Sequence, residues 1–228
     1  MSVLSACQAA GLRIKGEQPG SLFSGPTKFA GELANLANET VADLLERHDW
    51  RRLAKTHTIT GDGTETAFGL PADYDRMPLN AKLYASSSQT PLTPIEDSDQ
   101  LVQFAIDPVV ADPGVWGIFG GALHILPALG NGATVKFAYQ CNLAIADGTK
   151  SMFSADADGF DLDPRLLTLG VIWRWRAQKR LEYAEDLASF EHAVAARAGR
   201  DKGARVLKVG TPRYGSDVNV AYPGTIAP

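Results

Sequence analysis

Apolar residues recur at helical spacing in the first fifty positions of the chain. Ser2 can accept a hydrogen bond at a helix start, and the short helix that it opens is expected to end at about Ala10, where Gly11 offers a natural stop. After a loop that contains glycine, serine and proline, Thr27 is a second candidate N-cap. The stripe of leucine, alanine and valine that follows predicts a longer helix, which fades between residues 48 and 50.

The same helical period returns in the last third of the chain. Asp163 followed by Pro164 combines an N-cap acceptor with the residue best suited to the first helical position, so a helix is expected from there to about Leu181. A one-sided apolar stripe that begins near Tyr183 predicts another helix, with Gly199 as its expected end. Both ends of the chain are therefore predicted to be helical.

The middle of the chain changes to the pattern of β-strands. Residues 52–60 alternate and are rich in threonine, which favours a strand. Gly61, Asp62 and Gly63 predict a tight hairpin turn, with residues 66–70 as the returning strand. Further strands are expected at residues 81–85, 115–119, 123–126 and 134–140, and a short helix capped by Ser98 is expected to run to about Ile106.

Together these patterns predict an α+β fold that is mainly α. The helices of residues 1–51 and 160–200 are expected to form one bundle, and residues 52–159 a β-hairpin-rich insertion. Residues 201–228 carry valines and tyrosines without a helical period, interspersed with glycine and proline. They are predicted to form an extended C-terminal arm that docks on another polypeptide. The alternative is a C-terminal strand that completes the chain's own sheet.

The composition is that of an ordinary globular protein. Of the 228 residues, 45% are hydrophobic and 21% are charged. No run approaches the roughly eighteen apolar residues of a membrane span, and no secretory signal is expected from the first residues. The cysteines Cys7 and Cys141 lie far apart, which suits a reducing cytosol, and Cys7 is expected to be a buried, unreactive thiol.

The charge balance argues against a protein that grips DNA. The net charge is −4, whereas a protein that neutralises phosphates is usually basic. The basic cluster Arg174, Arg176 and Arg180 lies beside acidic residues that can neutralise it, and it is interpreted as a solvated face or a subunit interface. Arg174 falls on the apolar stripe of its helix, so it is expected to have an ionic partner or to face a neighbouring subunit.

The sequence contains no recognisable catalytic or cofactor-binding motif, so no enzyme activity, cofactor or metal is expected. An acidic run after residue 155 lacks the glycine and glutamate spacing of an EF-hand loop, and it is interpreted as a solvated loop whose last aspartate caps a helix. The residues of this run are Asp156, Asp158, Asp161 and Asp163. The four histidines, which share no ligand spacing, are His48, His57, His124 and His192.

Four stretches in order resemble a known family. SLFSGPTKFAGELANLANETVADLLERHDWRRLAKTHTITGDGT is similar to the early helix, tryptophan and first strand of phage head–tail adaptor proteins. FGLPADYDRM is similar to their strand-to-loop segment, GGALHILPA to their central hairpin, and LLTLGVIWRWRAQKRLEYAEDLASFEHAV to their C-terminal helix pair. The resemblance covers residues 1 to about 197, and the family includes tail accessory or tail tubular A-type proteins.

The resemblance implies a structural virion protein at the head–tail junction, made in the host cytoplasm. It implies a dodecameric ring of adaptor subunits under the portal protein, with genomic DNA passing through unbound and a tail nozzle, terminator or stopper protein on the other face. The arm residues expected to bind the portal are Val206, Leu207, Val209, Tyr214, Val218, Val220, Tyr222 and Ile226. Trp116, Phe119 and His124 are the candidates for the tail-facing surface.

Three other functions compete with this interpretation. A stopper or tail-completion protein is usually smaller and more purely β, so the long predicted helices argue against it. A tail-associated cell-wall hydrolase needs an acidic pair in a cleft, whereas Glu182, Glu185 and Asp186 are expected on a helix surface. A DNA-binding regulator would show salt-dependent DNA binding.

Overall fold

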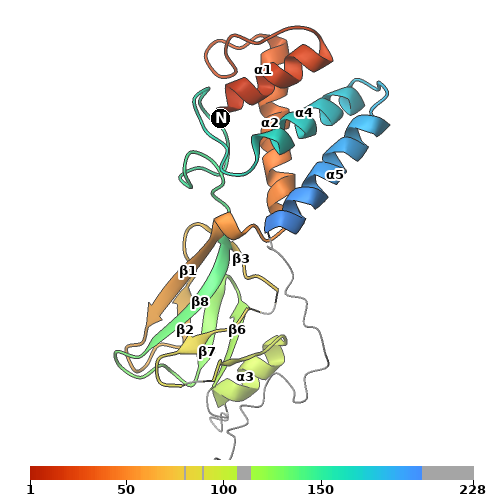
Figure 1. The fold of residues 1–228 in the computed structure, drawn as a ribbon. Coiled ribbons are helices and arrows are strands. Elements are labelled where there is room, and N and C mark those ends of the chain that lie inside the picture. The colour runs from red at the N-terminus through yellow and green to blue at the C-terminus, as the bar shows by residue number, and fades with distance from the viewer. Residues whose placement is uncertain (80, 89, 107–113, 202–228) are drawn as a thin grey trace, which may run out of the picture.

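The computed structural model describes residues 1–79, 81–88, 90–106 and 114–201. The fold is α+β and mainly α, with 40% of residues in helices and 21% in strands, which confirms the predicted fold class. Four helices gather at one end of the molecule and the strands lie at the other (Figure 1). The helices of this bundle are α1 (Val3–Ile14), α2 (Lys28–Arg47), α4 (Pro164–Gln178) and α5 (Ala184–Asp201).

The N-terminal helices begin where the sequence predicts. The Ser2 hydroxyl oxygen accepts from the Ser5 N–H at 3.3 Å, and the Thr27 hydroxyl accepts from the Ala30 N–H at 3.2 Å. The predicted stop at Gly11 is wrong, because α1 continues to Ile14. Gly11 is needed for packing instead, since a Cβ there would lie 2.5 Å from the carbonyl oxygen of Glu17 in the following loop.

The C-terminal helices also start as predicted and end elsewhere. Asp163 accepts a hydrogen bond from the Arg165 N–H at 3.0 Å, and Pro164 occupies the first turn of α4. The helix ends at Gln178, three residues before the predicted end, and Arg180 then takes a left-handed conformation with φ 57°. Helix α5 passes through Gly199, which is therefore not its end.

One sheet is organised around its longest strand. Strand β8 (Thr134–Cys141) runs antiparallel to β1 (Ala54–Thr60), with His57 opposite Phe137 in the register. The short strands β3 (Tyr74–Arg76) and β4 (Tyr84–Ala85) also pair with β8, and β4 covers only the end of the strand predicted at residues 81–85. A 3-10 turn at Arg51–Leu53 joins α2 to β1.

The second sheet contains the predicted central hairpin. Strands β6 (Val115–Phe119) and β7 (Ala122–Leu126) are antiparallel, and Gly120 and Gly121 form the turn between them with positive φ. Strand β2 (Ala67–Gly69) pairs with β7, and β5 (Thr93–Pro94) pairs in parallel with β6. Helix α3 (Ser98–Ile106) has the predicted bounds, although the side chain that accepts from its first turn belongs to Asp97, not to Ser98.

The predicted hairpin between the first two strands does not form. Strand β2 joins the sheet of β7, not that of β1. Gly61 explains the difference, because its N–H donates to the carbonyl of Ala133 at 2.8 Å and a Cβ there would overlap the side chain of Leu129. The loop is therefore packed against residues 129–133 and carries the chain from one sheet to the other.

A single apolar cluster runs through most of the described chain. It includes Leu33 and Ile172 from the bundle and Leu123 and Phe137 from the two sheets, all at most 2% exposed. The segment of residues 142–163 packs on the bundle, where the Val3 N–H donates to the carbonyl of Asp158 at 2.8 Å. Among the described residues, no helix has the length and apolar character needed to span a bilayer.

Candidate functional site

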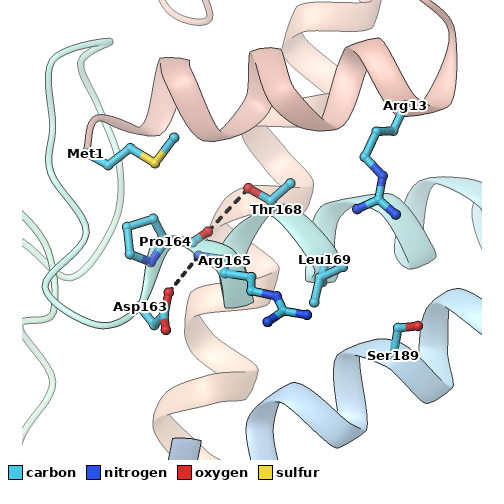
Figure 2. Close-up of a pocket in the computed structure, with 8 residues that line it drawn as sticks. All are labelled: Met1, Arg13, Asp163, Pro164, Arg165, Thr168, Leu169 and Ser189. Atoms are coloured by element: carbon cyan, nitrogen blue, oxygen red, sulfur yellow. Dashed lines mark hydrogen bonds between the residues drawn. The ribbon is translucent and has the colours of Figure 1, made fainter.

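An open groove lies between three helices of the bundle. Its volume is about 510 Å³, and α1, α4 and α5 each contribute to its walls (Figure 2). Arg13 enters it from α1, Arg165 from α4, and Ser189 faces it from α5. The remaining lining residues are Met1, Asp163, Pro164, Thr168 and Leu169.

The first turn of α4 forms the floor of this groove and ties it to α1. The Thr168 hydroxyl lies 3.3 Å from the carbonyl oxygen of Pro164 and 3.4 Å from that of Ala6, so it bonds both to its own helix and to α1. Asp163 caps the same turn through the Arg165 N–H. The floor of the groove is therefore the regular, capped N-terminus of α4.

The groove carries more positive than negative charge. Arg13 and Arg165 are both exposed, and neither has an ion pair within the described part of the chain. Arg197 Nε lies 3.9 Å from Asp163, which is the carboxylate among the lining residues. Two arginines that the described residues leave without an ion pair favour an anionic partner.

Helix α2 packs against the other side of α4. Gly170 allows the close approach, because a Cβ there would overlap the methyl group of Thr40. One turn later, the Arg174 guanidinium pairs with Asp43 at 2.7 Å and lies over the Trp173 ring at 4.5 Å. The groove and α2 thus occupy opposite faces of α4.

The ion pair between α2 and α4 extends to α5. Asp43 also pairs with Arg47 at 3.0 Å, and Arg47 pairs with Glu191 at 2.6 Å. The hydrogen bond to Glu191 raises the pKa of Arg47 above its ordinary value, against the opposing effect of its partial burial. This network joins three helices and belongs to the internal stabilisation of the bundle.

The predicted interface arginines have different surroundings. Arg174 is 11% exposed and has the ionic partner that the sequence leads one to expect. Arg176 pairs with Asp186 at 2.5 Å, and Arg180 is exposed just beyond α4. Of the three arginines, Arg180 is the most accessible to a neighbouring molecule. The interface role of all three remains a prediction.

The last described residue of α5 is held at the boundary between the bundle and the strands. Asp201 Oδ2 accepts from the Arg51 N–H at 2.9 Å and lies 3.3 Å from His48 Nε2. Arg51 begins the 3-10 turn that leads into β1. We call the contact of Asp201 with His48 and Arg51 the α5 latch.

The other predicted contact residues are only partly covered by the structure. All eight residues of the predicted portal-binding arm lie outside the described residues. Trp116 is 8% exposed, so a partner would contact little of its ring, whereas Phe119 and His124 are half-buried on the β6–β7 hairpin with ring centroids 6.4 Å apart. Their tail-facing role remains a prediction.

The acidic run is held by the chain's own groups. Asp156 accepts from the Ser21 hydroxyl at 2.6 Å and from the Leu22 N–H at 2.7 Å, and these bonds lower the pKa of Asp156 below its ordinary value. Asp158 accepts from Lys150 at 2.7 Å. Within the described ranges, no three His, Cys, Asp or Glu side chains gather in a way that could hold a metal ion.

Cys7 is buried as predicted. Burial raises the pKa of its thiol to about 12, so the group is protonated and unreactive near neutral pH. The groove and the α5 latch were not predicted from the sequence. An arginine at the end of α1 and another at the start of α4 give no local signal of their proximity, because only tertiary packing brings them together.

The fold and its surfaces define a class of protein. This is a mainly α, α+β protein with a positively charged groove in its helical bundle and with Asp201 of α5 bound to the turn that leads into β1. The chain matches the model of the SU10 adaptor protein family over residues 1–221, and it belongs to that family, a family of phage head–tail adaptors. No curated protein matches the chain.

Family membership confirms the resemblance noted in the sequence. It supports a structural role in the phage virion, in association with other virion components.

Proposed function

We propose that the chain assembles into a dodecameric ring at the head–tail junction, where its C-terminal arm binds the portal protein and its β-rich end faces the tail. Genomic DNA passes through the ring without specific binding. The net charge of −4 supports this, because a lumen that neutralised phosphates would retain the DNA. Membership of an adaptor family supports the same role.

The α5 latch is the observation that carries the proposal. It holds Asp201, the described residue that precedes the arm, at the junction between the bundle and the strands, midway along the molecule (Figure 1). A segment that starts at a fixed point can reach a partner with less loss of freedom than one that starts from a mobile end. Several such arms in one ring bind with avidity even when each contact is weak.

Deletion of residues 204–228 tests the proposal. The truncated chain is expected to stay folded, as judged by circular dichroism, and to lose binding to the portal protein of the same phage in a pull-down. Before it meets the portal, the full-length chain is expected to be a monomer or to self-associate weakly in light scattering. Undiminished portal binding by the truncated chain, or a stable dodecamer without the portal, would contradict the proposal.

A substitution series provides the matched control. Val218, Val220 and Tyr222 are changed together to serine in one variant, and the neighbouring polar residues Asp217 and Asn219 are changed to serine in the other. Apolar burial on the portal predicts that the first variant loses binding and that the second keeps it.

A further inference from the structure

One exposed side of α2 carries an acidic stripe. Asn35, Glu39, Ala42 and Glu46 are all exposed and recur three or four positions apart, so they share one side of the helix. Glu39 accepts a hydrogen bond from Asn35 at 2.9 Å, and neither glutamate has an ion pair with any described residue. We call these four residues the α2 stripe.

The α2 stripe and the groove lie on different faces of the bundle. Thr40 meets Gly170 on the buried side of α2, and the stripe residues lie roughly 100–160° around the helix axis from it. On α4, Arg165 and Leu169 line the groove, whereas Gly170 and Arg174 face α2. The groove and the α2 stripe are therefore two different faces of the subunit.

We propose that the groove of one subunit receives the α2 stripe of a second copy of this chain. The charges are complementary, because Arg13 and Arg165 in the groove and Glu39 and Glu46 on the stripe all lack ionic partners among the residues that the structure describes. Groove-to-groove and stripe-to-stripe contacts would juxtapose like charges, which disfavours a two-fold dimer made through either face alone. A contact between two different faces repeats head to tail, and it closes into a ring when the rotation allows.

The shapes of the two faces support this contact. Ala42 lies between the two glutamates and leaves room for the α2 backbone to approach, and the groove offers the small side chains of Thr168 and Ser189. Glu39 and Glu46 are about 10.5 Å apart along the helix axis, so they can engage two separate arginines. The inference deepens the proposed function, since it identifies the faces that would join neighbouring subunits of the ring.

Disulfide trapping tests the contact without the portal. Ala42→Cys and Ser189→Cys variants are purified separately, mixed at high concentration and oxidised. The native Cys7 and Cys141 are 0% and 2% exposed, so they do not compete. A disulfide-linked heterodimer between the two variants is expected. Ser189→Cys mixed with Glu65→Cys, an exposed position on the β-rich end, is the control and is expected to give no more than background cross-linking.

Charge reversal tests which attractions hold the faces together. One variant carries Arg13→Glu and Arg165→Glu, and the other carries Glu39→Lys and Glu46→Lys. In each variant alone, like charges meet at every contact between subunits. Its self-association and its assembly into a ring on the portal are therefore expected to weaken about tenfold or more. An equimolar mixture is expected to restore both, because alternating subunits again place opposite charges in contact.

The control reverses two lysines elsewhere. Lys82→Glu with Lys136→Glu changes the net charge as much as the groove variant but lies on the β-rich end. It is expected to associate like the wild type. The inference is overturned if each charge-reversed variant fills portal rings as the wild type does, if the mixture restores nothing, or if the trapped cysteines cross-link no better than the control pair.

The two proposals fail in different ways. If the cysteine trap forms but the wild-type chain does not bind the portal, the proposed function is wrong and the subunit contact stands. If the wild-type chain fills portal rings but the trap does not form, the contact is wrong and the adaptor function stands. Loss of DNA or portal affinity by the groove variant, with unchanged contact between subunits, would assign the groove to that other partner and overturn the inference.

Discussion

Gly170 lies where α4 packs closely against Thr40 of α2, and we predict that Gly170→Ala destabilises the protein. The new Cβ would overlap the methyl group of Thr40 and lie 3.0 Å from its hydroxyl oxygen and 3.2 Å from Phe190. Non-bonded carbon atoms prefer about 3.5–4.0 Å, so the helices must separate or Thr40 must rotate. Thr40 is held, because it is fully buried and its hydroxyl donates to the carbonyl of Leu36 at 2.7 Å.

Two opposing effects set the magnitude for Gly170→Ala. Alanine stabilises a helix interior by about 1 kcal/mol relative to glycine. Overpacking costs about 1–3 kcal/mol, and any separation of the helices also lengthens the Arg174–Asp43 pair beside the clash. We expect a net loss of about 1–2 kcal/mol in the free energy of unfolding, which for a chain of this size lowers Tm by about 2–8 °C.

Thermal and urea unfolding followed by circular dichroism measure this effect. Gly31→Ala in α2 and Gly199→Ala in α5 are matched controls, because a Cβ at either position meets nothing within 4 Å, and both are expected to be neutral or stabilising. Thr40→Ser removes the methyl group involved in the clash and should recover part of the loss in the double variant. A Gly170→Ala protein as stable as the wild type, or the absence of coupling with Thr40→Ser, would refute the steric argument.

Two further predictions concern stability. A hydrogen bond from Lys55 lowers the pKa of Asp73 against the effect of burial, and a hydrogen bond from the Tyr139 hydroxyl lowers it further. Asp73 therefore stabilises the fold fully at pH values above its ordinary pKa of about 4. This stabilisation is lost as the pH falls through the lower pKa of the folded state. Asp73→Asn should therefore be destabilising in urea at pH 7 and much less so at pH 3, and equal deficits at both would contradict this. Asp201→Ala removes the acceptor for the Arg51 N–H and should cost about 1 kcal/mol. Hydrogen exchange at that amide should accelerate in Asp201→Ala but not in the control Arg200→Ala, and unchanged exchange would disprove the α5 latch.

The helix starts could be predicted from the sequence because their causes are local. Ser2, Thr27 and Asp163 each accept a hydrogen bond from an N–H two or three residues ahead, and such a signal lies within a few letters of sequence. The helix ends at Gly11 and Gly199 were predicted wrongly. At Gly11 the residue serves a tertiary contact with the loop at Glu17, and no local rule distinguishes that use of glycine from a C-cap.

The strands could be located from their alternation, but their partners could not. Residues 115–119 and 122–126 pair as neighbours in sequence, so their hairpin was predicted. Strand β1 instead pairs with β8, some eighty positions further on, because Gly61 packs against residues 129–133 rather than turning the chain back. Pairings between distant strands depend on which apolar faces meet, and a pattern along one strand does not contain that information.

Internal charges differ from those available to partners in whether the fold pairs them. Arg174 draws attention in the sequence because it interrupts an apolar stripe, yet the fold supplies Asp43 from α2 and pairs the charge within the subunit. Arg13 and Arg165 are unremarkable in sequence, but packing of α1 on α4 places both at one groove and gives neither a carboxylate within the described chain. A charge that its own chain neutralises contributes little to recognition, whereas an unpaired one keeps its field for a partner. Candidate partner-facing charges are therefore those that the described part of the subunit leaves unpaired, and the groove and the α2 stripe each bring two such charges of one sign together.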